Sequence, residues 1–420
     1  MCSVSTEPIP ASPPGPAPVG AALRERVRRL RVLEEEERRF RPSVYWYLTF
    51  RCNLACAHCS VQSSPWVDSS KDLTTDECMQ VVEQLAELDV HAALLTGGEL
   101  LIRPDALRIL EALADRGIMA GVETNGIHYP AGFFELARAM QARGLFAMTV
   151  SLDGGTPETH ERLRGPKSFE RTVAGLHLLK EHGIRFNVQC VLNHENYGTI
   201  PDLYRLAGTL FPECGTVQWG LLNPVGRGAG LVQELGLQPG DVAAIFELIK
   251  GVEAEFPGKT VVKVPPGAVP PRYLPLVAKG AGIKSVTTCQ FPLLGILPNG
   301  DVTVCAVSRE NADLRFGNVR DEGFRLKLCW ERTRMDMLRS RYVAAEHLAG
   351  ICGDCVWKYS CKGACRAWAY EEGDSFDAPF PLCKALDEAG AFPKAYRLSS
   401  QNAAAAAAFQ KMSGGCGCSL

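Results

Sequence analysis

The cysteines constrain this chain more than any other residue type. It carries 17 of them in 420 residues, and most fall into groups. In the reducing cytosol, clustered cysteines are more often metal ligands than disulfide partners. The groups are Cys52, Cys56 and Cys59, then Cys289 and Cys305, and then Cys352, Cys355, Cys361, Cys365 and Cys383. This spacing predicts metal sites.

The composition is that of an ordinary globular protein, with 46% hydrophobic and 22% charged residues. A formal net charge of −2 provides no basic field that would attract nucleic acid. No apolar run is long enough to cross a bilayer, and the N-terminus lacks the apolar segment of a signal peptide. We therefore expect a cytoplasmic protein that binds neither nucleic acid nor a membrane.

Strand-like and helix-like patterns alternate through the first half of the chain. Apolar runs typical of strands lie at Val44–Phe50, Ala92–Leu95, Met119–Glu123, Ala147–Leu152, Phe186–Leu192 and Thr216–Gly220. Amphipathic patterns typical of helices lie between them, at Thr75–Leu88, Asp105–Ala114 and Gly132–Ala142 among others. Repeated strand–helix units predict a parallel sheet covered by helices, in the α/β class.

The composition also suggests how the chain is divided. We expect a disordered and then charged, helical segment over residues 1–41, and a catalytic core over 42–255. A Pro- and Gly-rich segment, 256–288, is expected to act as a bridge. Residues 289–390 hold most of the remaining cysteines and are expected to need metal to fold. Residues 391–420, which include six consecutive alanines, are expected to form a flexible tail.

The first cysteine group has the spacing C-x3-C-x2-C and follows the first predicted strand directly. Three thiolates on one tight loop can each hold one iron of a 4Fe–4S cluster, which leaves the fourth iron open for a chelating ligand. The alternative is a zinc site completed by His58. Adjacent residues such as His58 and Cys59 ligate one ion with difficulty, so the loop favours iron–sulfur over zinc.

Further polar and glycine-rich motifs come at the ends of the next predicted strands. Gly97-Gly98-Glu99 follows the second strand, Thr124-Asn125-Gly126 the third, and Ser151-Leu152-Asp153-Gly154 the fourth, before His160 and Arg164. The carboxyl ends of parallel strands form the edge at which α/β sheets bind ligands. These motifs are therefore expected to surround one ligand site.

With the cysteine loop, these motifs resemble the radical S-adenosylmethionine superfamily over about residues 43 to 385. The resemblance implies a partial (β/α)6 TIM-like barrel in which Cys52, Cys56 and Cys59 hold a 4Fe–4S cluster that binds S-adenosylmethionine. It implies that Gly97, Gly98 and Glu99 approach the methionine amino group, and that Ser151 and Arg164 contact the ribose and carboxylate. Asn125 and Asp153 would shape the turns of the same cofactor site.

The second cysteine region resembles the SPASM extension of many peptide-modifying members of that superfamily. The resemblance implies two auxiliary 4Fe–4S clusters. The first would be held by Cys289, Cys305 and Cys365, and the second by Cys352, Cys355, Cys361 and Cys383. Cys329 could complete the first set, although packing in the core is its expected role. The alternative is a pair of zinc ribbons, because C-x2-C pairs are common zinc ligands.

The resemblance implies an enzyme that cleaves S-adenosylmethionine to a 5′-deoxyadenosyl radical, which removes a hydrogen atom from the substrate. The expected substrate is a ribosomally made peptide that receives a cross-link, a thioether or an epimerised residue. An alternative is a small-molecule enzyme of tetrapyrrole or other cofactor biosynthesis. A non-catalytic, zinc-stabilised binding protein is a third hypothesis.

Sulfatase maturation is disfavoured, because Ala306 stands where those enzymes carry an aspartate. The expected partners are a reductant such as flavodoxin or ferredoxin and either a separate leader-peptide-binding protein or none. A fused winged-helix domain is not expected, because only about 42 residues precede the first strand, too few for one.

Overall fold

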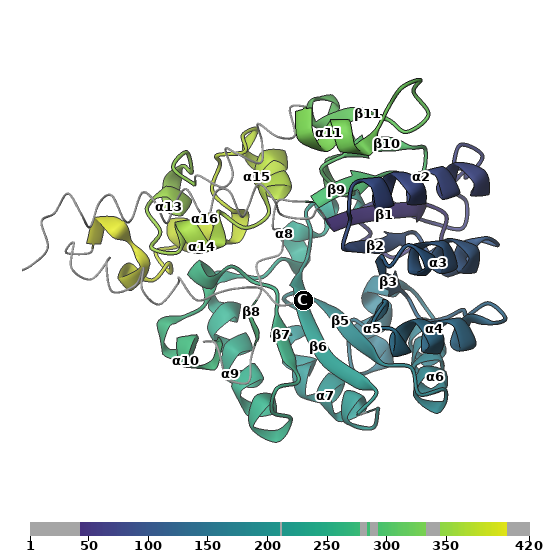
Figure 1. Ribbon diagram of the computed structural model, residues 1–420. Helices are drawn as coiled ribbons and strands as arrows, with labels where there is room; N and C mark the ends of the chain where they lie inside the picture. Colours follow the sequence, from purple (N-terminus) through teal and green to yellow (C-terminus); the bar gives the residue numbers. More distant parts are fainter. Residues whose placement is uncertain (1–42, 211, 278–283, 286–292, 333–344, 401–420) are drawn as a thin grey trace, which may run out of the picture. The chain divides into compact units, whose positions relative to one another are not determined.

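The computed structural model describes residues 43–210, 212–277, 284–285, 293–332 and 345–400 (Figure 1). The predictions made for residues 1–41, for Cys289 and for the stretch 401–420 lie outside these ranges. Within them, the predicted α/β architecture is confirmed, because a sheet of mostly parallel strands alternates with helices.

Six parallel strands form the centre of the sheet and follow one another in chain order from β1 to β6. Their bounds lie within two residues of the predicted strands, and β5 matches its prediction at both ends. The strands are β1 Ser43–Thr49, β2 Ala92–Gly97, β3 Met119–Thr124, β4 Phe146–Ser151, β5 Phe186–Leu192 and β6 Cys214–Leu221.

Helices connect these strands and lie along one side of them in Figure 1. A capping box starts α2, where the Thr74 hydroxyl accepts a hydrogen bond from Glu77 N and the Glu77 carboxylate accepts one from Thr74 N. The helices are α2 Thr75–Glu87, α3 Ala106–Asp115, α4 Phe133–Ala142, α5 Pro157–Arg164, α6 Ser168–Glu181, α7 Ile200–Gly208, α8 Val232–Leu235 and α9 Pro239–Glu255.

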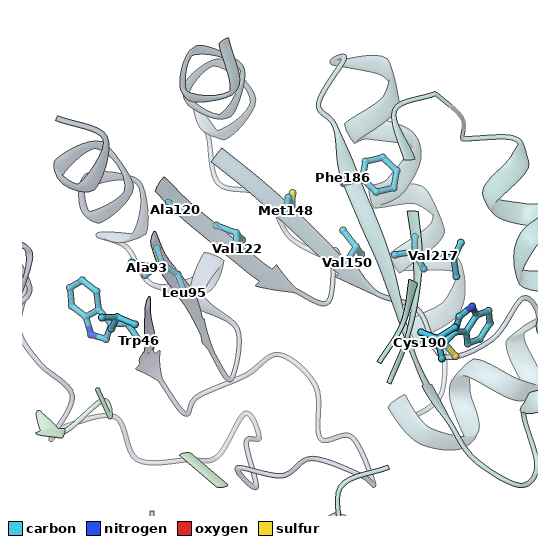
Figure 2. Close-up of a cluster of buried hydrophobic side chains, with 14 of the residues drawn as sticks. Trp46, Ala93, Leu95, Ala120, Val122, Met148, Val150, Phe186, Cys190 and Val217 are labelled. Carbon is cyan, nitrogen blue, oxygen red and sulfur yellow. The ribbon is translucent and has the colours of Figure 1, made fainter. Parts of the chain in front are cut away.

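The hydrophobic core lies on the helix-covered face of the sheet. Alternate strand residues are buried there, among them Trp46, Leu95, Val122, Val150 and Cys190 (Figure 2). The intervening residues of the same strands remain partly exposed, as Tyr45, Glu123, Ser151, Gln189 and Gln218 do. We call the face that carries these five residues the inner face. Period-two alternation thus leaves one apolar and one more polar face on the parallel sheet.

The sheet extends beyond the six central strands on both sides. The segment expected to be a bridge contributes β7 Thr260–Val262 and β8 Lys284–Ser285, which continue the parallel order after β6. On the other side, β9 Leu293–Ile296 pairs in parallel with β1. Two antiparallel strands, β10 Asp301–Thr303 and β11 Arg315–Asn318, follow β9. These strands have two to four residues, too few for periodicity to reveal them.

The C-terminal cysteine region folds as short helices joined by turns. Trp368 packs edge-on against Phe380, with ring centroids 4.9 Å apart.

The expected tail begins later than predicted, because Tyr396 is fully buried and its hydroxyl donates to Val269 O over 2.9 Å. The helices of this half are α10 Leu274–Val277, α11 Leu326–Arg332, α13 Gly350–Gly353, α14 Lys358–Cys361, α15 Arg366–Gly373 and α16 Pro381–Glu388. Among the described residues, no helix has the length and apolarity to span a membrane.

Candidate functional site

The first three cysteines lie on a loop, residues 51–64, that follows β1; we call it the cysteine loop. The loop is closed at its ends, because Cys52 N donates to Ser64 O over 3.1 Å. A tighter turn within it is made by Cys59 N, which donates to Cys56 O over 3.2 Å. Its backbone therefore turns back on itself and gathers the three cysteines in one short segment.

Glycines at the end of β2 allow the chain to pass close to the start of this loop. Gly98 N donates to Thr49 O over 2.7 Å, and Glu99 N donates to Arg51 O over 3.0 Å. A Cβ atom on Gly98 would lie 2.1 Å from Arg51 O, and Gly97 adopts φ +142°, which favours glycine. The two glycines are needed for contact with the cysteine loop, whatever they do toward a ligand.

The Glu99 carboxylate is fully buried and joins β2 to the end of β3. Its Oε1 accepts from Leu101 N over 3.1 Å, and its Oε2 accepts from the Thr124 hydroxyl and from Asn125 N, both over 2.8 Å. Burial raises the pKa of Glu99 despite these donors. Glu99 therefore shapes the site by holding the Asn125 turn, and its direct contact with an amino group stays a prediction.

Asn125 connects the end of β3 to the first cysteine. Its Nδ2 donates to Asn53 Oδ1 over 2.6 Å and lies 3.9 Å from Cys52 Sγ. Its backbone carbonyl accepts from the Thr172 hydroxyl on α6 over 3.0 Å. The turn-shaping role expected of Asn125 thus extends to the cysteine loop itself.

Arg164, at the end of α5, reaches the second cysteine and is held there by Asp153. Arg164 Nε donates to Asp153 Oδ2 over 2.6 Å, and its Nη1 lies 4.0 Å from Cys56 Sγ. Asp153 is completely buried, and its Oδ1 accepts from Val191 N over 2.8 Å. Burial alone would raise the pKa of Asp153, but the charge of Arg164 outweighs it and lowers the pKa. Asp153 is therefore the ionised counter-ion of Arg164.

His58 faces the same carboxylate, with its Nε2 3.6 Å from Asp153 Oδ2. Burial lowers the pKa of His58 to about 4, so the ring is neutral at physiological pH. Its Nδ1 is buried without a hydrogen-bond partner. His58 is thus turned toward Asp153, which argues against its completing a zinc site with the three cysteines.

The chemistry of the three thiols fits an iron–sulfur cluster better than a single ion. Burial, with smaller contributions from Glu99, Cys56 and Cys59, raises the pKa of Cys52 to about 12. Burial likewise raises the pKa of Cys56. The iron ions of a 4Fe–4S cluster supply the positive charge that stabilises buried cysteines as thiolates. Each of the three cysteines would bind a different iron.

Arg227, which the sequence analysis missed, holds the cysteine loop from the end of β6. Its Nε donates to Cys56 O over 2.8 Å and its Nη2 donates to Ser63 O over 2.7 Å. The preceding Gly226 adopts φ +61°, and a Cβ there would lie 2.4 Å from Ser60 O. The sequence signal was the Gly226-Arg227-Gly228 turn after a predicted strand, which has little specificity by itself.

Ser151 ends β4 and stands in register with Gln189 on β5, on the inner face. It belongs to the same carboxyl edge of the sheet as Gly97 and Asn125, since each comes at or just after the end of its parallel strand. The structure therefore assembles the predicted cofactor residues along one edge, beside the cysteine loop.

Four cysteines of the second region line one small cavity. Trp357 N donates to Cys355 Sγ over 3.4 Å, and Phe380 N donates to Cys352 Sγ over 3.2 Å. Both sulfur atoms therefore act as hydrogen-bond acceptors. Burial raises the pKa of Cys355 and Cys361 to about 12 and also raises that of Cys383. The cysteines are Cys352, Cys355, Cys361 and Cys383, the set assigned from sequence to the second auxiliary cluster.

The other auxiliary cysteines are placed less completely. Cys305 and Cys365 each precede a short helix, at Ala306–Ser308 and at α15, and these two helices pack together. Cys365 Sγ accepts from Trp368 N over 3.4 Å. Their predicted partner Cys289 lies outside the described residues. Cys329 is buried in the main hydrophobic core, consistent with a packing role.

Comparison with known proteins identifies both halves of the chain. The model of the radical SAM superfamily matches residues 46–207, and that of the SPASM iron–sulfur cluster-binding domain matches residues 289–356. An AdoMet-dependent heme synthase of Methanosarcina barkeri is 30% identical, with 81% of this chain and 95% of the relative covered.

Two further similarities are to a protein named a maturase and to a solved structure with a bound precursor peptide. The mycofactocin maturase MftC of Mycobacterium ulcerans is 28% identical, with 80% of this chain and 86% of the relative covered. The structure of Streptococcus suis SuiB bound to its precursor peptide SuiA superposes with a TM-score of 0.60 and 14% identity, covering 91% of this chain and 84% of that one. This last likeness concerns the fold alone.

Proposed function

This chain belongs to the radical S-adenosylmethionine superfamily and carries a SPASM domain, and we propose that it modifies a ribosomally made peptide oxidatively. As a member it is an enzyme that uses S-adenosylmethionine with 4Fe–4S clusters, auxiliary ones included. The observation that carries the catalytic assignment is the cysteine loop, which Asn125, Arg164 and Arg227 hold at the carboxyl edge of the parallel strands.

The residues for each cofactor follow from this placement. Cys52, Cys56 and Cys59 would hold the catalytic cluster. S-Adenosylmethionine would lie along the edge formed by Gly97, Gly98, Glu99, Asn125, Ser151 and Arg164. When bound, the two together supply a carbon radical that removes a hydrogen atom from an unreactive carbon.

The side chains around this site perform the tasks left to the protein. Asp153 fixes the Arg164 guanidinium, whose remaining N–H groups are available to a carboxylate and to the charge at Cys56. Asn125 and Arg227 hold the cysteine loop in position, and the buried surroundings of Cys52 and Asp153 keep water away from it.

The auxiliary ligands form the second part of the proposal. Cys352, Cys355, Cys361 and Cys383 would hold one cluster in the cavity that they line. Cys289, Cys305 and Cys365 would hold the other. A zinc-ribbon pair is the weaker interpretation, because the model of an iron–sulfur cluster-binding domain matches residues 289–356, which include Cys305, Cys352 and Cys355.

A peptide is the proposed substrate because a relative named as a maturase matches 80% of this chain. Modification of a tetrapyrrole is the second candidate, since the relative with 30% identity is named a heme synthase. Similar identities to the two relatives make the substrate the part of the proposal that an experiment must decide.

The decisive experiment is anaerobic co-expression with each short open reading frame beside the gene, followed by intact-mass measurement. We expect one peptide to lose the mass of two hydrogen atoms with the native enzyme and to remain unchanged with Cys59→Ala. Unmodified peptides together with turnover of Fe-coproporphyrin III by the purified enzyme would favour the tetrapyrrole candidate and contradict the peptide one.

A further inference from the structure

Lys263 follows β7 directly, at the same edge of the sheet as the cofactor residues. Its backbone N donates to Trp219 O over 2.7 Å, so the parallel pairing of β6 and β7 continues to this residue. The register places Ser151 beside Gln189, Gln189 beside Gln218, and Gln218 beside Val261. Side chains two residues apart share a face of a strand, so Lys263 lies on the inner face as Val261 does. It is two residues closer than Val261 to the carboxyl edge of the sheet.

The Lys263 ammonium is held by a neutral group. Nζ donates to Gln189 Oε1 over 2.5 Å. No acidic side chain within the described ranges forms an ion pair with it, unlike Arg164, which has Asp153. Burial lowers the pKa of Lys263, and only the more distant Glu123 acts in the opposite direction. Lys263 is partly buried. A desolvated cation without an ion-pair partner is costly, and an anionic ligand would relieve that cost.

The position of Lys263 suits a substrate group. Gln189, its hydrogen-bond partner, is the register neighbour of Ser151, the residue proposed to contact the ribose. Glu123 on β3 is in register with Thr149, which lies two residues before Ser151 on the same face of the sheet. The Glu123 carboxylate accepts a hydrogen bond from the Tyr45 hydroxyl over 3.1 Å. The inner face thus carries the Glu123 carboxylate and the Lys263 ammonium beside the cofactor edge. The carboxylate accepts a hydrogen bond from a hydroxyl group, whereas the ammonium donates only to the neutral Gln189 amide.

We propose that Lys263 binds a carboxylate of the substrate and so positions the substrate beside S-adenosylmethionine. The inference rests on the proposed function, since it assigns a substrate-binding role to the face next to the cofactor edge. Two sources share this chemistry: an acidic residue of a peptide and a propionate of a tetrapyrrole. In both, the ammonium pairs with a carboxylate while Gln189 holds the lysine side chain in place.

The test is site-resolved protection of Lys263 from acetylation in the reconstituted holoenzyme, kept anaerobic with S-adenosylmethionine. Acetylation by sulfosuccinimidyl acetate is read by mass spectrometry of the tryptic peptide 260–272, with exposed Lys250 as the internal control. The peptide probes are acetyl-Ala-Glu-Ala-amide and its Gln counterpart. The tetrapyrrole probes are Fe-coproporphyrin III and its tetramethyl ester.

We expect one carboxylate probe to reduce acetylation of Lys263 about tenfold at ten times its Kd, with its neutral counterpart inactive and Lys250 unchanged. Protection by the Glu peptide supports the inference with a peptide source. Protection by Fe-coproporphyrin III alone supports the inference with a tetrapyrrole source, while arguing against the peptide function. Protection by neither carboxylate probe, or equal protection by each neutral counterpart, overturns the inference.

Two variants provide an independent measurement of the same contact. Lys263→Met is expected to weaken binding of the protecting carboxylate probe by about tenfold or more, since a hydrogen bond to a charged group is lost. Lys263→Arg, which keeps the charge, is expected to retain most of the affinity. Unchanged affinity in Lys263→Met would contradict the carboxylate contact, whereas failure of the proposed function would show instead as unmodified peptides in the co-expression experiment.

Discussion

Cys59→Ala is expected to reduce formation of 5′-deoxyadenosine by about a thousand-fold or more, because the cofactor carries the chemistry that the protein cannot supply. Cys59 is one of three cysteines on the cysteine loop, and two ligands from that loop would not retain the cluster. The auxiliary cysteines lie elsewhere in the chain and should keep their iron. The measurements are iron content per chain and 5′-deoxyadenosine quantified by chromatography after reduction with dithionite.

A matched control is Cys214→Ala, which removes a buried thiol from β6 that belongs to no proposed ligand set. We expect this variant to keep all its iron and its S-adenosylmethionine cleavage. Normal cleavage by Cys59→Ala, or equal iron loss in both variants, would contradict the assignment of the cysteine loop as the catalytic cluster site.

Asp153→Asn should lower the free energy of unfolding by about 3–5 kcal/mol, because it leaves the buried charge of Arg164 without its counter-ion. The asparagine amide must also direct its NH2 group toward either Arg164 Nε or Val191 N, which are both donors. S-Adenosylmethionine should bind more weakly because Arg164 is no longer fixed beside Cys56. Urea denaturation and equilibrium binding of S-adenosylmethionine measure the two effects.

The double variant Asp153→Asn, Arg164→Gln separates stability from cofactor binding. Removing both charges should recover part of the lost stability, since no unpaired buried charge remains. It should not recover the affinity for S-adenosylmethionine, because the guanidinium is absent. Native affinity in Asp153→Asn would show that Asp153 does not position Arg164 for the cofactor.

The central strands could be predicted because each buries alternate residues against helices over six to eight positions. β5 illustrates this: Phe186, Val188, Cys190 and Leu192 are buried, and the residues between them are partly exposed. The strands β7 to β11 could not be predicted in the same way. They are short and lie among prolines and glycines, and β9 joins the sheet by pairing with β1, which is distant in sequence.

The cysteine ligand sets could be proposed from spacing, and the cavity lined by Cys352, Cys355, Cys361 and Cys383 brings one of those sets together. The supporting charges could not be proposed, because their roles depend on contacts across the fold. Asp153 was expected to shape a turn but pairs with Arg164, and Arg227 lies 171 residues after Cys56 in the chain. Glu99 accepts hydrogen bonds from Leu101 N, the Thr124 hydroxyl and Asn125 N, contacts that its motif did not reveal.

The central claim is that the cysteine loop holds a cluster to which S-adenosylmethionine binds at the edge formed by Asn125, Ser151 and Arg164. The most direct test is pulsed electron–nuclear double resonance of the reduced enzyme with S-adenosylmethionine carrying 17O in its carboxylate. We predict a 17O coupling to the cluster in the native enzyme and in Cys214→Ala, and none in Cys59→Ala. A reduced native enzyme whose cluster signal shows no coupling to the labelled carboxylate would contradict the account.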